Sequence, residues 1–134
     1  MERVTYLLDT NAVADYINGF EPTTSRLKQA IREGHLLCLC RPVYYEVLRG
    51  LLKTKADRKR RVFEEQFAPQ LVAVALIDAD WQQAARFWAD AVNAGRQLAD
   101  TDLLIAAITR RIGGGWSVLT PILTRCPLPG KTGV

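Results

Sequence analysis

The sequence predicts an α/β fold, a three-layer sandwich in which helices cover both faces of a central parallel sheet of about four or five strands. Short strand-like runs alternate along the chain with longer segments whose apolar residues recur at helical spacing. One strand-like run, residues 71–77, is almost continuously apolar, which is typical of a strand buried on both faces. Strands that alternate with helices in this way usually lie parallel, joined by right-handed crossovers.

Length and composition narrow the class of protein. A chain of 134 residues is the size of one domain, so we expect residues 1–134 to form a single unit. Its 49% hydrophobic and 24% charged residues exclude a disordered polymer. The absence of an apolar run near ~20 residues and of a signal segment predicts a cytoplasmic protein with no membrane association. The net charge of +4 permits a nucleic-acid partner without requiring one.

The first elements follow from β-branched runs and turn residues. Val4–Leu8 reads as a strand, and a second element spans Ala12–Ile17. Ser25–Glu33 has helical spacing, and Gly34 is a suitable residue to end it. Leu36–Cys40 is the second strand. We expect the elements to follow one another as strand, helical segments and strand.

The cysteines and the histidine do not indicate a disulfide framework or a zinc site. Cys38 and Cys40 alternate with leucine, which predicts that both point to one face of a buried strand. With Cys126 the chain has three cysteines, and an odd number without paired spacing does not indicate a disulfide framework. His35 is the only histidine and has no ligand set at useful spacing, so we interpret it as a surface loop residue.

The middle of the chain predicts two more helices and a strand. Pro42 opens a helix, Asp57 is a candidate cap for a helix over Arg58–Phe67, and Leu71–Ile77 is the third strand. The helix that begins at Pro42 has one apolar face, formed by Val43, Val47, Leu48, Leu51 and Leu52.

The last elements are a helix pair and a short strand. Asp78 is expected to cap a helix that runs to Asn93. We expect Trp81 and Trp88 to pack in the core on a stripe shared with Ala84, Ala85 and Val92, with a platform for a ligand as the alternative. A helix over Thr101–Ile112 is followed by glycines and by a fourth strand over Trp116–Leu119.

Four carboxylates are expected at one edge of the sheet. Asp9 follows the first strand, Glu46 lies early in the helix after the second strand, and Asp100 and Asp102 begin the helix before the last strand. Each has a plain structural explanation: a turn residue for Asp9, an N-cap for Asp100, a favourable helix-dipole contact for Asp102, and an ion pair with Arg49 for Glu46.

Together, these carboxylates favour a metal site. Clustered carboxylates repel one another, and a cation offsets that repulsion. Oxygen ligands without His or Cys suit Mg²⁺ or Mn²⁺. One or two such ions can activate water for phosphodiester hydrolysis.

Three segments of the sequence resemble the signature segments of PIN domains, and most closely those of VapC-type toxins. They are Leu7-Leu8-Asp9-Thr10-Asn11, Pro42 to Gly50 with Glu46 inside it, and Asp100-Thr101-Asp102 followed by an apolar run. The resemblance covers the chain to about Ile112. It implies a metal-dependent endoribonuclease that uses Mg²⁺ or Mn²⁺, forms a homodimer, cleaves RNA and is neutralised by a cognate antitoxin protein.

The resemblance also assigns roles to individual residues. Asp9, Glu46 and Asp102 are implied to be catalytic carboxylates that hold the metal, with Asp100 as a fourth. The polar residues implied to orient these carboxylates or water are Thr10, Asn11 and Thr120.

The segment from about residue 116 departs from the family pattern. No acidic residue follows Asp102, where the family usually has another acidic or polar position. One hypothesis is that this tail is read out of frame, which the nucleotide sequence of the gene decides. The alternative function is therefore a weakened or inactive PIN-fold protein that mainly binds an antitoxin or dimerises.

Basic and aromatic residues suggest where RNA would bind. Arg49, Lys53, Lys55 and Arg58 are the candidate RNA contacts, with a solvated helix face as the alternative for the dense cluster that continues to Arg61. Tyr44 and Tyr45 are candidates for stacking on unpaired bases, although we expect one of the two in the core.

A small phosphate-ligand protein on an unrelated doubly wound fold is a rival explanation. No glycine-rich loop follows the first strand, and Gly113-Gly114-Gly115 comes after a helix instead of before one. The pattern therefore disfavours this rival.

Overall fold

The computed structural model describes residues 5–112 and contains a parallel sheet in that range. Strands β1 (Thr5–Leu7), β2 (Leu36–Cys40) and β3 (Val72–Val74) lie in the order β1-β2-β3. In the register, Thr5 pairs with Leu36 and Cys38 pairs with Val72. The predicted parallel sheet is confirmed, with three strands in the part of the chain that the structure describes.

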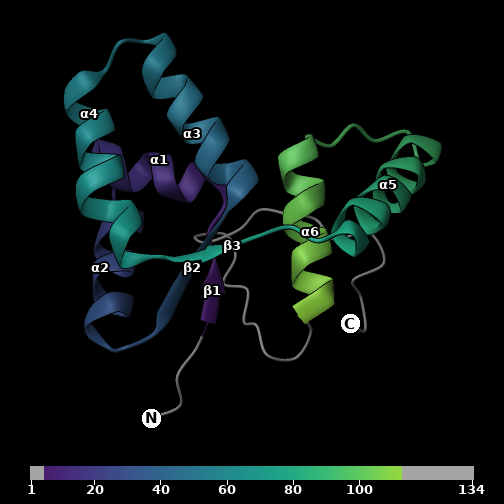
Figure 1. The fold of residues 1–134 in the computed structure, drawn as a ribbon, viewed down its shortest axis with the longest axis horizontal. Helices are drawn as coiled ribbons and strands as arrows, with labels where there is room; N and C mark the ends of the chain where they lie inside the picture. The colour runs from purple at the N-terminus through teal and green to yellow at the C-terminus, as the bar shows by residue number, and fades with distance from the viewer. Residues whose placement is uncertain (1–4, 113–134) are drawn as a thin grey trace.

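Helices flank the sheet on two sides. Figure 1 shows α1 to α4 on one side of the strands and α5 and α6 on the other, as the three-layer prediction requires. The main helices are α1 (Thr10–Asn18), α2 (Thr23–Arg32), α3 (Arg41–Lys53), α4 (Asp57–Arg61), α5 (Asp78–Asn93) and α6 (Asp100–Ile112). A π-helical turn (Val62–Phe67) and a 3₁₀ turn (Ala68–Gln70) continue from α4 to β3. Among the described residues, no helix is long and apolar enough to cross a membrane.

The core is built around β2 and α6. The strand β2 has the predicted bounds, and Cys38 and Cys40 are both buried. Burial raises the pKa of each thiol to about 11. In α6, the run Leu103–Ile108 is buried on every side of the helix, since α6 lies between the sheet and α5. These two buried elements fix the positions of the helix α3, which follows β2, and of the first turn of α6.

The third strand is shorter and more exposed than predicted. The run Leu71–Ile77 forms a strand only over Val72–Val74, and Val72 and Ala73 are exposed. Within the described residues, β3 pairs with β2 alone. The apolar run therefore predicted a strand correctly, but the prediction that this strand is buried on both faces is wrong. The reason is that β3 is an edge strand of the described sheet.

The prediction that Trp81 and Trp88 pack in the core is wrong for this structure. They are 55% and 52% exposed. The buried stripe of α5 is instead Asp80, Ala84, Phe87 and Ala91. This stripe is displaced by about one residue from the predicted one, because burial of Asp80 brings Phe87 and Ala91 inward and turns the tryptophans outward.

Two predicted helix caps are also wrong. Asp57 and Asp78 are the first residues of their helices, and the residues in the N-cap positions are Ala56 and Ile77. The carboxylate that caps α5 belongs to Asp80, whose Oδ2 accepts a hydrogen bond from the Ile77 amide at 3.0 Å. A carboxylate at the third position of a helix can reach back to the N-cap amide, as in a capping box.

His35 is not a surface residue. Its side chain is only 9% exposed, packs edge-to-face against Tyr6 with 6.0 Å between ring centroids, and lies 3.4 Å from a Glu33 carboxylate oxygen. Its place just before β2 carries it inward against β1. The predicted strand at Trp116–Leu119, together with Thr120 and Cys126, lies outside the described residues.

Candidate functional site

Asp9 connects the first strand to the first helix. It is 2% exposed and occupies the N-cap of α1, where its Oδ1 accepts a hydrogen bond from the Ala12 amide at 2.8 Å. A cap of this kind satisfies an amide that lacks a partner within the helix, and it places the carboxylate at the positive end of the helix dipole. The structural role of Asp9 is therefore that of a helix N-cap, not of the turn residue that the sequence predicted, and this role fixes where the carboxylate lies.

Glu46 joins three segments of the chain. From the second turn of α3, its Oε1 accepts a hydrogen bond from the Thr10 hydroxyl at 2.5 Å. Its Oε2 accepts one from the Thr101 hydroxyl at 3.1 Å. Thr10 begins α1 and Thr101 lies in the first turn of α6, so the carboxylate is oriented by two helix starts that are far apart in the sequence.

Asp102 adds a second negative charge beside Glu46. The side chain is partly buried, and the pKa of its carboxyl is raised, first by loss of solvation and second by the negative charge of Glu46. Arg49 forms an ion pair with Glu46: its Nη2 lies 3.7 Å from Oε2, and its side chain is 59% exposed. The expected pair of Glu46 with Arg49 is confirmed, but an exposed pair of this length neutralises little charge.

The remaining predicted site residues are Asp100 and Asn11, and they lie at the starts of two different helices. Asp100 is exposed at the first position of α6, so it is not the N-cap that one alternative predicted, but it lines a cavity of ≈ 570 Å³ with Glu46. Asn11 is exposed in the first turn of α1. The structure therefore brings together Glu46, Thr10 and Asp102, and places Asp100 at the wall of the same cavity.

The basic candidates divide into two groups. Arg49 lines the cavity beside Glu46, whereas Lys53, Lys55 and Arg58 are exposed near the turn between α3 and α4. Figure 1 shows this turn at the end of α3 that points away from α6. Lys53 follows Glu46 by seven residues, roughly 10 Å along the helix axis. These three cations are not gathered at the carboxylates.

Tyr44 and Tyr45 have different environments, as predicted. Tyr44 is partly buried and packs on Phe63 with 5.0 Å between ring centroids. Tyr45 is 62% exposed, and the Arg49 guanidinium lies over its ring at 5.2 Å. Only Tyr45 is therefore open to a ligand.

The donor chemistry at Glu46 and Asp102 fits a hard divalent cation. Two adjacent carboxylates repel each other, and Thr10 and Thr101 hold one of them in place. Within residues 5–112, no group of three or more His, Cys, Asp or Glu side chains is placed to hold one metal ion. Magnesium is commonly bound through only one or two carboxylates, with water and substrate phosphates completing its shell. Two protein carboxylates are therefore enough for a site of this kind.

Sequence reasoning missed Thr101. The sequence predicts Thr101 as the first residue of a helix, and it lies between the two aspartates of the third signature segment. A hydroxyl between two acidic residues at a helix start is a signal of a hydrogen-bond donor to a neighbouring carboxylate, and here that carboxylate is Glu46.

Comparisons with known proteins identify the family and the fold of the chain. The family model described as PIN domain matches residues 6–116. No curated protein sequence matches the chain.

Several solved structures share the fold at low sequence identity. VapBC2 from Rickettsia felis bound to a promoter DNA fragment has a TM-score of 0.71 and 18% identity, over 90% of this chain and 96% of that one. DNA-bound VapBC from Salmonella typhimurium has a TM-score of 0.69 and 17% identity, over 87% and 97%. A toxin–antitoxin complex from Klebsiella pneumoniae has a TM-score of 0.62 and 14% identity, over 87% and 84%.

Proposed function

Because the chain belongs to the PIN domain family, we propose that it is a metal-dependent endoribonuclease and the toxin of a toxin–antitoxin pair. The observation that carries this proposal is the hydrogen-bonded carboxylate Glu46, held by Thr10 and Thr101 beside the second carboxylate Asp102. Three segments distant in the sequence converge on one charged group, and the two neighbouring carboxylates are ligands of the kind through which Mg²⁺ is commonly bound.

Each residue has a definite task in this proposal. Glu46 and Asp102 hold Mg²⁺ or Mn²⁺, with Asp9 and Asp100 as additional carboxylates at the same edge. Thr10 and Thr101 fix the carboxylate plane of Glu46, so that its oxygens need not reorganise when a ligand binds. A bound divalent ion supplies an activated water and neutralises charge on the phosphate. Arg49, with a mostly exposed guanidinium, contacts the RNA phosphate.

The partners follow from the same comparison. Solved structures that share the fold include VapBC complexes and a complex described as toxin–antitoxin, which supports a cognate antitoxin protein as the binding partner. A cytoplasmic location and a homodimer belong to the proposal as well. Lys53, Lys55 and Arg58 then form a more distant RNA contact on the α3–α4 turn.

The direct test is RNA cleavage with purified protein in the presence and absence of Mn²⁺. Glu46→Gln and Asp102→Asn should each abolish Mn²⁺-dependent cleavage, because each removes a ligand charge. Asp90→Asn is a matched control, since Asp90 is an exposed aspartate of α5 that lines none of the cavities described above. Cleavage that persists in both site variants would exclude the proposed metal site.

One observation favours a second candidate, a PIN-fold protein without activity that binds an antitoxin. No acidic residue follows Asp102 in the sequence, and the described residues contain no group of three ligands. This candidate predicts that wild-type protein binds an antitoxin but neither cleaves RNA nor gains thermal stability from Mn²⁺. Calorimetric titration with Mn²⁺ distinguishes the two candidates independently of cleavage.

A further inference from the structure

The cavity beside Glu46 has a wall that the proposed chemistry leaves unused. It has a volume of ≈ 570 Å³ and lies between α3, the start of α5 and the start of α6. Its polar and aromatic lining consists of Arg41, Tyr45, Glu46, Arg49, Trp81, Asp100 and Thr101. Glu46, Asp100 and Thr101 belong to the carboxylate site, and the other four side chains have no task there except the phosphate contact of Arg49.

Two large aromatic side chains of this wall are exposed. Tyr45 on α3 is 62% exposed and Trp81 on α5 is 55% exposed. Exposed tyrosine and tryptophan side chains beside a polar cleft are typical of sites that stack on flat ligands. Because the two residues come from helices on opposite sides of the sheet, they line the cavity from different directions.

Two arginines accompany the aromatics. The Arg41 guanidinium lies over the Tyr44 ring at 4.8 Å, and that of Arg49 lies over the Tyr45 ring at 5.2 Å. These ring contacts orient the guanidinium groups without removing their charge. An oriented guanidinium binds phosphate through two parallel hydrogen bonds. Aromatic faces and arginines in one cavity match the base and the phosphates of a nucleotide.

We propose that this cavity is a nucleotide subsite, in which one unpaired RNA base stacks on Tyr45 and Trp81 while Arg41 and Arg49 bind the flanking phosphates. The inference rests on the proposed ribonuclease function and adds the residues that select its substrate. A base inside a duplex has both faces covered by its neighbours, so only an unpaired or flipped base can stack on protein side chains. The subsite therefore selects single-stranded RNA next to the carboxylates.

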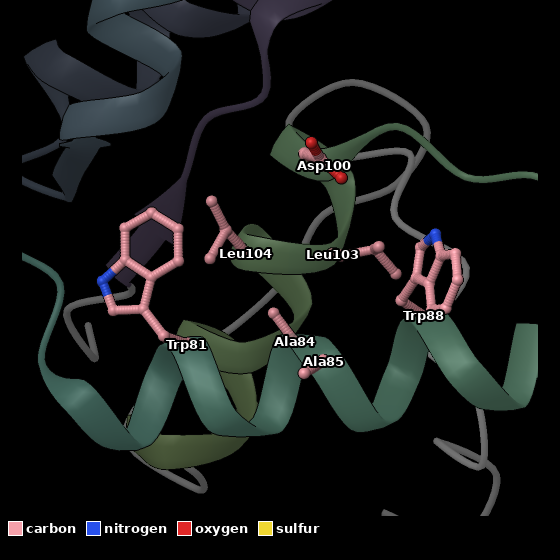
Figure 2. A pocket seen from close by; sticks show the side chains of 7 residues that line it. All are labelled: Trp81, Ala84, Ala85, Trp88, Asp100, Leu103 and Leu104. Carbon is pink, nitrogen blue, oxygen red and sulfur yellow. The ribbon is translucent and has the colours of Figure 1, made fainter.

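A second cavity on the other side of Trp81 provides a contrast. Figure 2 shows Trp81 and Trp88 on α5 with Ala84 and Ala85 between them, and Leu103 and Leu104 of α6 opposite. This cavity of ≈ 370 Å³ shares Asp100 with the first cavity, but none of the described residues that line it is Lys or Arg. Phosphate is not attracted to such a wall. Trp88 has nearly the same exposure as Trp81 but lines only this second cavity, so it is the matched control.

The test measures binding of a short fluorescein-labelled single-stranded RNA by fluorescence anisotropy in the presence of Mg²⁺. The protein is the full chain with Asp102→Asn, so that the RNA remains intact. Adding Trp81→Leu should weaken binding about 5- to 100-fold, the loss expected when one base loses its stacking platform. Trp88→Leu should leave binding unchanged. Arg41→Gln should lower the slope of log K against log salt by about 0.7, the value for one phosphate on a single strand.

Several outcomes would overturn the subsite. One is equal binding by the folded Trp81→Leu and Trp88→Leu variants, and another is equal or tighter binding of the same RNA annealed to its complement. A third is a change of sedimentation coefficient in Trp81→Leu without a change in RNA binding, which would assign this wall to contact with a second copy. Circular dichroism checks folding of each variant.

Failure of the enzyme function looks different from failure of the subsite. If wild-type protein does not cleave RNA but Trp81→Leu still weakens RNA binding selectively, the subsite holds and the ribonuclease proposal fails. If wild-type protein cleaves with Mn²⁺ and Trp81→Leu cleaves and binds equally well, the ribonuclease proposal holds and the subsite fails.

Discussion

Asp80 and Glu46 are both carboxylates that join helices distant in the sequence, but their charges are compensated differently. The Asp80 side chain is fully buried, and its Oδ1 lies 2.8 Å from Arg111 Nε while its Oδ2 accepts the Ile77 amide. Glu46 is 29% exposed and has two threonine hydroxyls as donors. Among residues 5–112, its ion-pair partner is the exposed Arg49, at 3.7 Å.

The difference separates a structural carboxylate from one that is available for chemistry. The charge of Asp80 is balanced by Arg111, in a contact that joins the start of α5 to the end of α6. A cation from solution would therefore find no unbalanced negative charge at Asp80. Glu46 lies beside Asp102, whose pKa its charge raises, so a divalent ion would relieve repulsion. The number of hydrogen bonds is similar at the two positions, and the charge balance is what distinguishes them.

The largest expected effect comes from breaking the Asp80 pair. Arg111→Leu should lower the free energy of unfolding by about 3–5 kcal/mol, because it leaves the Asp80 carboxylate buried without its cation. Urea denaturation followed by circular dichroism measures this. Arg110→Leu is the control, because Arg110 is the exposed neighbour on α6 and its guanidinium lies over the Phe87 ring at 6.0 Å. Equal losses in the two variants would contradict a structural role for the pair.

The next effect concerns Cys40, whose raised pKa is due first to burial and in part to the negative charge of Asp80. The thiol has a pKa of about 11 in the folded protein against 9.0 in the unfolded chain, so the unfolded chain loses its proton first. Stability from the neutral thiol is full below pH 9 and is lost as pH rises toward 11, by about 1 kcal/mol at pH 10.

Urea denaturation at pH 8.5 and pH 10 measures this loss, with Cys40→Ala as the comparison. The variant should lose less stability over this interval than wild type, since it lacks the buried ionisable group. An identical loss in both proteins would place the cause in another group.

Glu46→Gln, unlike Arg111→Leu, should change the stability of the protein mainly when Mn²⁺ is present. Without metal, the free energy of unfolding should change by no more than about 1 kcal/mol, because the amide keeps hydrogen-bonding groups for Thr10 and Thr101 and removes repulsion with Asp102. In wild type, Mn²⁺ at 100 times its dissociation constant should add about 2.7 kcal/mol, and the variant should lose this gain. Thermal denaturation with and without Mn²⁺ tests both statements, and a Mn²⁺ gain retained in Glu46→Gln would contradict them.

The sequence predicted the convergence at Glu46 because strand ends in a parallel sheet share an edge. Asp9, Glu46 and Asp102 each follow or precede a strand-like run, so the sequence predicts that their segments meet at that edge. In the structure, Asp102 lies beside Glu46, and Thr10, which follows Asp9 in the chain, donates a hydrogen bond to Glu46. The prediction needed topology and no side-chain detail. It therefore placed the carboxylates by segment but left out Thr101, whose role depends on the rotation of α6.

The face of α5 was predicted wrongly for a related reason. Counting apolar residues favoured the tryptophans as the buried stripe, since Asp80 counts as polar. In the structure, Arg111 satisfies Asp80 from 31 residues away, and this pair turns Phe87 inward and Trp81 outward. A long-range ion pair cannot be read from local periodicity, so the sequence could not reveal which stripe is buried.

The smallest expected effect tests the hydroxyl that orients Glu46. Thr101→Val removes the hydrogen bond to Oε2 at 3.1 Å and should lower the free energy of unfolding by about 1 kcal/mol. Its effect on Mn²⁺ affinity should be about tenfold, because the carboxylate is then held by Thr10 alone and loses orientation. Thr109→Val is the control on the same helix, since the Thr109 hydroxyl donates a hydrogen bond to the Ile105 carbonyl one turn earlier, a contact of little net stability. Calorimetric titration with Mn²⁺ compares the two variants. A weaker affinity in Thr101→Val but not in Thr109→Val would establish that the hydroxyl acts through Glu46, and equal affinities would reduce Thr101 to a residue that only begins α6.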